Sequence, residues 1–219
     1  YYLLLDEVQL LDGFEYVLNG YLQEPNLDIY VTGSNAKFLS QDIITEFAGR
    51  GDAIHMYPLS FAAFMTAYSG DRYAGLTEYM LYGGLPLVVS KKNADEKASM
   101  LETLFQEIYL RDIYLRHNVK NQDELEDLLN VISSGIGSLT NPEKLKKTFQ
   151  SRKNSKITSA TIKKYLGYLE DSFLVESASR YDIKGKEYIE TPKKYYFSDL
   201  GLRNARLNFR QFEENHAME

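Results

Sequence analysis

Two short apolar runs near the beginning of the chain each end in polar residues. The stretch YYLLLDE occupies residues 1–7, and the stretch LDIYVTGSN occupies residues 27–35. The first has too few polar interruptions for a half-exposed strand and is too short for a helix, so we expect a parallel strand covered on both faces. The second run is similar, and residues 13–24 between them supply a crossover helix. Such a strand–helix–strand unit brings the polar ends of both strands to one rim of a parallel sheet.

The polar residues at these strand ends have two interpretations. Asp6 and Glu7 follow a buried strand, where carboxylates resist ionisation unless they meet a cation or hydrogen-bond donors. A Mg²⁺ ion provides that cation, and the alternative is that both acids only cap the next helix. Ser34 and Asn35 are either phosphate-sensing groups on the same rim or an ordinary Asx turn. Arg50 follows a helical stripe and is either a phosphate ligand or a solvated helix cap.

The next segment of the chain favours helices. Residues 36–50 carry a helical apolar stripe, and DAIHMYPLS at residues 52–60 predicts a shorter third strand. A Tyr-rich helical segment follows, and the sequence YGGLP at residues 82–86 predicts a turn. Residues 95–117 carry apolar positions at helical spacing and predict a long helix. We therefore expect a helical region over residues 61–120.

From residue 122 the pattern changes to short helices followed by two strands. Pro142 stands at a first-turn position, and Thr158 or Ser159 can cap the third helix. We expect helices at residues 122–136, 141–151 and 157–172, and strands at residues 173–183 and 186–198, joined by Lys184-Gly185-Lys186. Three short helices followed by a hairpin with a basic tip is the order of a winged helix-turn-helix, which we expect over residues 121–209.

The charge of the chain is divided between its two parts. The net charge is −6, but residues 1–142 hold 9 Lys and Arg against 20 Asp and Glu, whereas residues 143–219 hold 16 against 11. Eight cations occur from Lys144 to Lys164 with no acid among them. This segment makes DNA a candidate partner, and the alternative is a solvated helical face used for protein contacts. The nucleic-acid candidates are Lys156, Thr161, Lys163, Lys164, Lys184 and Lys186.

The composition argues against several classes of protein. The chain has no Cys, which excludes disulfides and thiolate metal sites, and its three His share no ligand spacing, so we expect no zinc. It has no apolar run long enough to cross a membrane and no order of residues typical of a secretory signal. We therefore expect a soluble, cytoplasmic protein with no membrane partner.

Several of these stretches together resemble a known family. They are LLLDEVQ, TGSNAKFLS, FAGR, MYPLSFAAF and YGGLP, with RDIYLR, TIKKYLGYLED and PKKYYFSDLGLRN later in the chain. They are similar to prokaryotic AAA+ type P-loop ATPases that carry a winged-helix region and, beyond it, a restriction-endonuclease-like domain of unknown function. The resemblance extends over essentially the whole chain. It implies an α/β plus α fold, in which a partial parallel P-loop NTPase sheet at residues 1–60, from Walker B to sensor, precedes the helical region and the winged helix.

The resemblance also implies roles for the residues on the predicted rim. It implies ATP and Mg²⁺ as cofactors, with Asp6 as the Mg²⁺ ligand and Glu7 as the catalytic base. Ser34 or Asn35 is then the sensor of the γ-phosphate, and Arg50 is a candidate arginine finger. Because such an arginine can act on a neighbouring subunit, a homo-oligomer is a further expectation.

One element of the family pattern is absent from these residues. No G-x-x-x-x-G-K-[ST] loop, which cradles phosphates, occurs in the sequence. The family has that loop upstream of the acidic strand, and residues 210–219 stand about where the nuclease-like domain begins. We therefore expect an internal fragment that does not bind ATP with normal affinity alone. Two functions remain open, namely ATP hydrolysis by a AAA+ ATPase coupled to a winged helix, and a non-catalytic DNA-binding or protein-interaction module.

Overall fold

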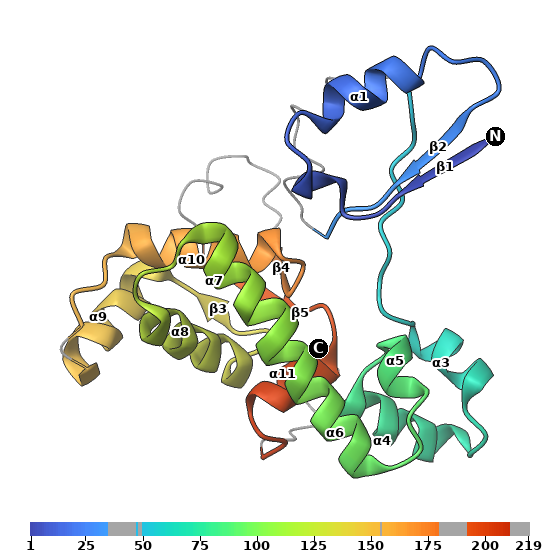
Figure 1. Ribbon diagram of the computed structural model, residues 1–219. Helices are drawn as coiled ribbons and strands as arrows, with labels where there is room; N and C mark the ends of the chain where they lie inside the picture. Colours follow the sequence, from blue (N-terminus) through green and yellow to red (C-terminus); the bar gives the residue numbers. More distant parts are fainter. Residues whose placement is uncertain (35–46, 48–49, 154, 180–191, 211–219) are drawn as a thin grey trace, which may run out of the picture. The chain divides into compact units, whose positions relative to one another are not determined.

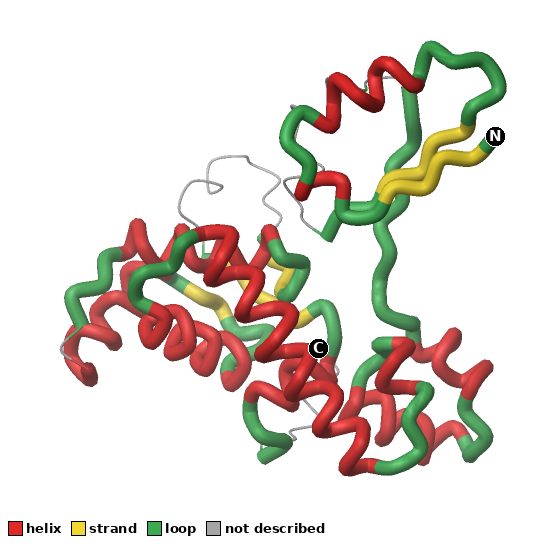
Figure 2. Tube along the Cα trace, viewed as in Figure 1, coloured by secondary structure: helices red, strands yellow, loops and turns green. Residues whose placement is uncertain are grey.

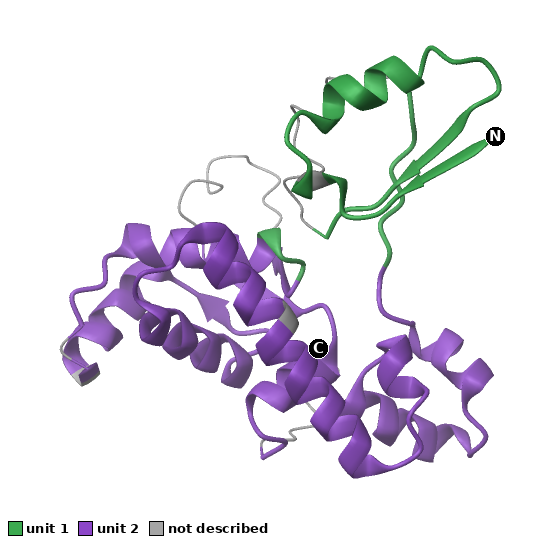
Figure 3. Ribbon diagram, viewed as in Figure 1, with its two compact units in different colours: residues 1–56, 171–173 green, residues 57–170, 174–219 purple. Residues whose placement is uncertain are grey.

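A computed structural model describes residues 1–34, 47, 50–153, 155–179 and 192–210. The chain divides into two compact units (Figure 3). Unit 1 comprises Tyr1–Met56 with Asp171–Phe173, and unit 2 comprises Tyr57–Glu170 with Leu174–Glu219. Among the described residues, no helix is long and apolar enough to cross a membrane.

Unit 1 is built on two parallel strands. Strand β1 (Tyr2–Leu5) pairs in parallel with strand β2 (Asp28–Val31) (Figure 1). The register sets Tyr2 opposite Asp28 and Leu5 opposite Val31. The short 3₁₀ helix η1 (Val8–Leu10) and helix α1 (Phe14–Tyr21) connect the two strands. The predicted strand–helix–strand unit is thus confirmed.

The prediction that the first strand is covered on both faces is wrong. Side chains along both strands alternate between exposed and half-buried, and Tyr2, Leu4 and Tyr30 are 74%, 73% and 58% exposed. The opposite face packs on Val8, Phe14 and Leu18 through Leu5, Ile29 and Val31, and Phe47 packs on the same cluster. Within the described part of unit 1, the connection through α1 covers only one face of the two-stranded sheet.

The predicted third strand is also not formed. Residues 51–60 run as a loop (Figure 2), in which the Leu59 amide donates to the Gly84 carbonyl at 2.8 Å and the Ser60 carbonyl accepts from the Phe64 amide of α3. A strand needs a neighbouring strand to satisfy its amides, and the described part of unit 1 offers no ladder to residues 51–60. The helix predicted at residues 36–50 lies almost entirely outside the described residues.

The first half of unit 2 is helical, as the sequence predicts. Its elements are α3 (Phe61–Ala67), α4 (Arg72–Tyr82), α5 (Pro86–Val89), α6 (Ala94–Thr103), the π-helix η3 (Leu104–Leu110) and α7 (Arg111–His117). Ser60 caps α3 by accepting a hydrogen bond from the Ala63 amide, and Asp71 caps α4 in the same manner. The long helix predicted at residues 95–117 is present as the continuous run α6–η3–α7, with a π-helical segment in its middle.

The second half of unit 2 combines helices with a small antiparallel sheet. Its elements are α8 (Gln122–Ser134), β3 (Leu139–Thr140), α9 (Pro142–Lys153), α10 (Ser159–Asp171), β4 (Val175–Ala178), β5 (Lys193–Phe197) and α11 (Leu200–Arg206). The strands lie in the order β3-β5-β4. Asn141 and Thr158 cap α9 and α10 through their side-chain oxygens. The predicted helices and antiparallel strand pair are present, and the short strand β3 is an addition.

Helix α11 braces the two halves of unit 2. The buried Asn204 amide donates to the carbonyls of Met80 and Leu81 at 2.9 and 2.8 Å, at the end of α4. The buried Arg203 donates from Nε to the Ser133 carbonyl at 2.9 Å, at the end of α8. The side chains of α11 therefore satisfy carbonyls that the last turns of two other helices leave open.

The beginning of α11 is joined to the predicted YGGLP turn. The Asp199 carboxylate is 3% exposed and accepts hydrogen bonds from the amides of Gly84 at 2.7 Å and Leu202 at 3.2 Å. Gly83 has φ +74°, and a Cβ atom there would collide with the Asp199 carboxylate. Only glycine suits this position without strain. Segments that are far apart in the sequence thus meet at one buried junction in unit 2.

Candidate functional site

The two acids of the first strand lie at its carboxyl end. Asp6 is exposed and Glu7 is half-buried, directly after β1. Glu7 has φ 50° and ψ 47°, a left-handed conformation that costs a non-glycine residue about 1–2 kcal/mol. The Glu7 amide is held by the Thr32 hydroxyl at 3.0 Å, and the Val8 amide by the Thr32 carbonyl at 3.1 Å. The surrounding contacts therefore fix a strained turn, as is common at functional sites.

Polar residues from the second strand complete this arrangement. The Thr32 hydroxyl donates a hydrogen bond to Asp6 Oδ1, and the Ser34 hydroxyl donates to Glu7 Oε2 at 2.8 Å. We call Asp6, Glu7, Thr32 and Ser34 the acidic rim. The structure thus brings together the acids and Ser34, which the sequence analysis selected, with Thr32, which it missed. The signal for Thr32 is its position as the first polar residue after β2.

The remaining rim candidates are less informative. Asn35 lies outside the described residues. Arg50 is exposed, and its Nη1 donates to the Asn19 side-chain oxygen of α1 at 2.9 Å. This contact ties Arg50 to α1 within unit 1.

A pocket of about 270 Å³ adjoins the acidic rim. Asp6 and Glu7 line it together with apolar side chains of η1 and α1, among them Leu10, Phe14 and Leu18. The pocket therefore has two carboxylates at its edge and hydrocarbon over most of its remaining surface.

The donor set of the rim suits a hard cation. Two carboxylates and two hydroxyls offer only oxygen, which Mg²⁺ prefers. Among the described residues, no three acidic, His or Cys side chains are grouped to hold a metal. Protein ligands from this rim alone would thus leave most of an octahedral shell to water or to phosphate oxygens, which is the usual way that proteins bind Mg²⁺ with nucleotides.

The described nucleic-acid candidates of unit 2 lie on α10 and in the loop before it. Lys163 and Lys164 are exposed on α10, Thr161 is half-buried in its first turn, and Lys156 is exposed in the loop before it. The Lys164 ammonium lies 5.7 Å from the centre of the Tyr168 ring, a cation–π contact. Lys184 and Lys186 lie outside the described residues.

The first turns of α9 and α10 lie close together. A hydrogen bond from Ser159 is the largest effect and lowers the pKa of the Glu143 carboxyl, burial opposes it, and the nearby Lys146, Lys147 and Lys163 each lower the pKa further by a smaller effect. Lys146 also pairs with Glu143 at 3.7 Å. Lys144, Lys147, Lys163 and Lys164, which we call the basic face, are exposed and form no ion pair with any acid that the structure describes.

Two family models match the chain. Residues 1–65 match a family described as an AAA domain, so the part of the chain that carries the acidic rim is AAA-like. Residues 73–213, which make up most of unit 2, match a family described as a domain of unknown function, DUF8612. The second match covers more than half of the chain.

Relatives with the same sequence pattern occur in a bacterium and in an archaeon. An uncharacterized protein of Haemophilus influenzae is 39% identical over 209 residues, covering 92% of this chain and 51% of the relative. An uncharacterized protein of Methanocaldococcus jannaschii is 28% identical over 221 residues, covering 94% of this chain and 48% of the relative. The chain spans about half the length of these curated relatives. The chain belongs to the family described as the domain of unknown function DUF8612, and an AAA-like segment precedes that domain.

Proposed function

We propose that unit 1 contributes the magnesium and water half of an ATP-hydrolysing site in a larger AAA+ type protein. The observation that carries this proposal is the acidic rim, in which two carboxylates and two hydroxyls meet at the carboxyl ends of parallel strands. In open parallel sheets, ligands bind at this edge. The match of residues 1–65 to an AAA domain supports the same reading.

Each rim residue has a distinct proposed role. Asp6 is the residue that holds Mg²⁺, since it is exposed and is oriented by the Thr32 hydroxyl. Glu7 takes a proton from the attacking water, and the Ser34 hydroxyl at 2.8 Å orients its carboxylate. When bound, Mg²⁺ neutralises charge on the phosphates. Ser34 or Asn35 is the sensor of the γ-phosphate. Arg50 is a candidate arginine finger that contacts a phosphate within its own subunit or across a homo-oligomer.

The test is ATP hydrolysis by the whole protein. Glu7→Gln keeps the shape of the side chain but removes the base, so turnover should fall by about 10²–10⁴-fold while nucleotide still binds. Asp6→Asn should raise the Mg²⁺ concentration that is needed for half-maximal turnover. Glu24→Gln is the matched control, because Glu24 is an exposed acid of unit 1 outside the rim. Unchanged turnover in Glu7→Gln would exclude Glu7 as the base.

The second proposed function is contact with duplex DNA through a winged helix-turn-helix. In a winged helix, the third helix enters the major groove, and the corresponding helix here is α10. The basic face favours this function, because its lysines are exposed and without acid partners among the described residues. The alternative is that this surface contacts a protein partner.

Salt dependence separates these possibilities. If the basic face contacts phosphates, a gel shift on duplex DNA should weaken as salt is raised, and Lys163→Glu/Lys164→Glu should reduce the slope of log affinity against log salt by about 2. Lys91→Glu/Lys92→Glu, in the loop that follows α5, is a control of equal charge change. Equal effects of the two double variants would remove α10 as the DNA contact.

A further inference from the structure

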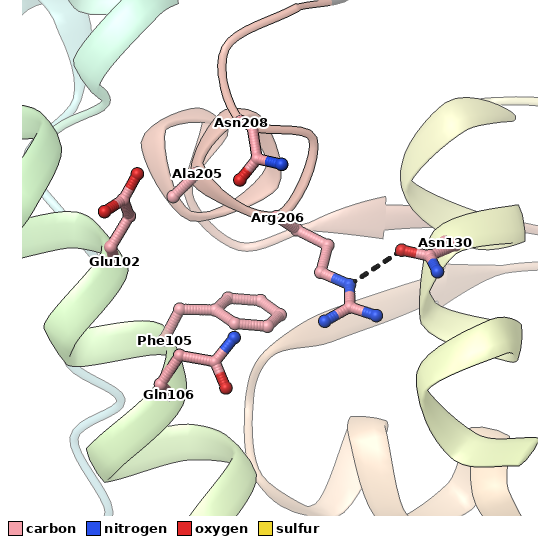
Figure 4. A pocket seen from close by; sticks show the side chains of 7 residues that line it. All are labelled: Glu102, Phe105, Gln106, Asn130, Ala205, Arg206 and Asn208. Carbon is pink, nitrogen blue, oxygen red and sulfur yellow. Dashed lines mark hydrogen bonds between the residues drawn. The ribbon is translucent and has the colours of Figure 1, made fainter. Parts of the chain in front are cut away.

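Unit 2 contains a polar pocket of about 400 Å³ that the proposed functions do not use (Figure 4). Its wall includes Phe105 and Gln106 from the π-helix η3, Asn130 from α8, and Arg206 and Asn208 at the end of the chain's last described helix. Pockets of this volume suit small molecules. A π-helical segment inside an α-helix is rare and occurs frequently at functional sites, and here it turns two consecutive side chains toward one pocket.

One end of the pocket offers hydrogen-bond donors. The Arg206 side chain is 8% exposed, and its Nε donates to Asn130 Oδ1 at 2.9 Å. Its Nη2 donates to the Glu126 carbonyl at 3.0 Å, and both Nη atoms reach Glu126 Oε2 at 3.4 Å. Because a guanidinium has five N–H groups, one Nη1–H has no acceptor among the described residues. The Asn130 oxygen is used by Arg206, so its NH₂ group is left to donate.

The opposite side of the pocket offers a carboxylate. Glu102, from α6, lies across the pocket from Arg206 (Figure 4), and it forms no ion pair with any described residue. The positive charge of Arg206 is already balanced by Glu126. The pocket therefore combines a donor end of low net charge with a negative side. A free phosphate ion fits this arrangement poorly, because Glu102 would repel it.

We propose that this pocket binds a small zwitterion of the free α-amino acid type. Its carboxylate accepts hydrogen bonds from Arg206 and Asn130, and its ammonium group faces Glu102. The carboxamides of Gln106 and Asn208, on the remaining sides, contact the ligand's side chain. This inference depends on unit 2 alone and is independent of the proposed nucleotide site.

The test is a titration of the ¹⁵N-labelled chain with each of the free L-amino acids, followed by the side-chain amide signals of Asn130, Gln106 and Asn208. At least one amino acid should shift these signals with a saturable curve. Its N-acetyl derivative and its α-amide, which each remove one charge of the zwitterion, should bind at least ten-fold more weakly. A panel in which no amino acid gives saturation, or in which the blocked forms bind equally, would overturn the proposal.

Substitution of an exposed residue in the pocket wall tests binding without disturbing the fold. Glu102→Gln should weaken binding about ten-fold, because it removes the partner of the ammonium group but not a side chain that the core needs. Glu107→Gln is the matched control, since Glu107 is an exposed acid of η3, which directly follows α6, and pairs with Arg111 at 3.7 Å. Unchanged affinity in Glu102→Gln, with an unchanged amide spectrum elsewhere, would also overturn the proposal.

Discussion

Replacing Asp199 by Asn tests whether the buried junction of unit 2 depends on a charged cap. Asp199 accepts from the Gly84 amide with one carboxylate oxygen and from the Leu202 amide with the other. Asparagine has a single acceptor oxygen, so one of these buried N–H groups loses its partner and faces an NH₂ group. An orphaned buried donor costs about 1–3 kcal/mol. We therefore expect Asp199→Asn to lower the free energy of unfolding by about 2 kcal/mol.

Urea unfolding followed by circular dichroism measures this loss. With a slope of about 2 kcal/mol per molar urea, the midpoint should fall by about 1 M. Asp71→Asn is the matched control, because Asp71 caps α4 on the surface and Asn caps helices as well as Asp does. That variant should change stability by only a few tenths of a kcal/mol. An equal loss in the two variants would refute the assignment of the cost to burial.

The stability difference between the native chain and Asp199→Asn should also depend on pH, with a defined sign. Burial raises the pKa of the Asp199 carboxyl above its usual value of 3.8, against the opposing effect of backbone N–H groups that include Gly84 and Leu202. The folded chain therefore binds this proton more tightly than the unfolded chain, and the resulting stabilisation is present at low pH and is lost as pH rises through the folded-state pKa. The stability difference between the native chain and Asp199→Asn should grow from pH 7 toward pH 4. A difference that shrinks on acidification would show that the N–H groups outweigh burial.

Three further substitutions test other contacts of unit 2. Gly83→Ala should cost more than about 2 kcal/mol in urea unfolding, because it combines positive φ with a collision at Asp199, whereas Gly20→Ala has open space around it and should not destabilise. Asn204→Ala leaves the carbonyls of two residues at the end of α4 without their donor and should cost about 2 kcal/mol in the same assay; no loss would refute the brace. Burial, aided by Glu170, raises the pKa of Tyr195 to about 12, so its contribution to stability is lost as pH rises from 10 toward 12. Tyr195→Phe should consequently lose less stability than the native chain between pH 9 and 11, and parallel losses would refute this.

The sequence predicts the elements of this protein better than its sheet. Strands β1 and β2 and the helices of unit 2 follow from apolar periodicity, which local sequence carries directly. The expected strand at residues 52–60 is not formed, because a strand is defined by a partner and not by its own residues alone. Strand β3, with two residues, is too short to give a periodic signal.

The candidate site, like the fold, can be predicted only in part from the sequence. The acids and Ser34 stand out because charged or polar residues follow an apolar run. Thr32 is missed because its importance lies in hydrogen bonds to Asp6 and Glu7, about 25 residues earlier in the chain. The pocket of unit 2 could not be predicted from the sequence, since α6, η3, α8 and α11 contribute only one or two residues each and a π-helix has no sequence signature that we can recognise.

The brace formed by α11 also has a consequence for the order of folding during synthesis. Its contacts to Gly84 and Met80 span 115 and 124 residues of chain, and Asp199 and Asn204 lie near the end of the described residues. Until these residues leave the ribosome, the Met80 and Leu81 carbonyls and the Gly84 amide lack the side-chain partners that Asn204 and Asp199 provide. The closure of such long loops is slow, because chain entropy is lost before the contacts form. Unit 2 therefore stays open for most of its translation and closes when α11 emerges.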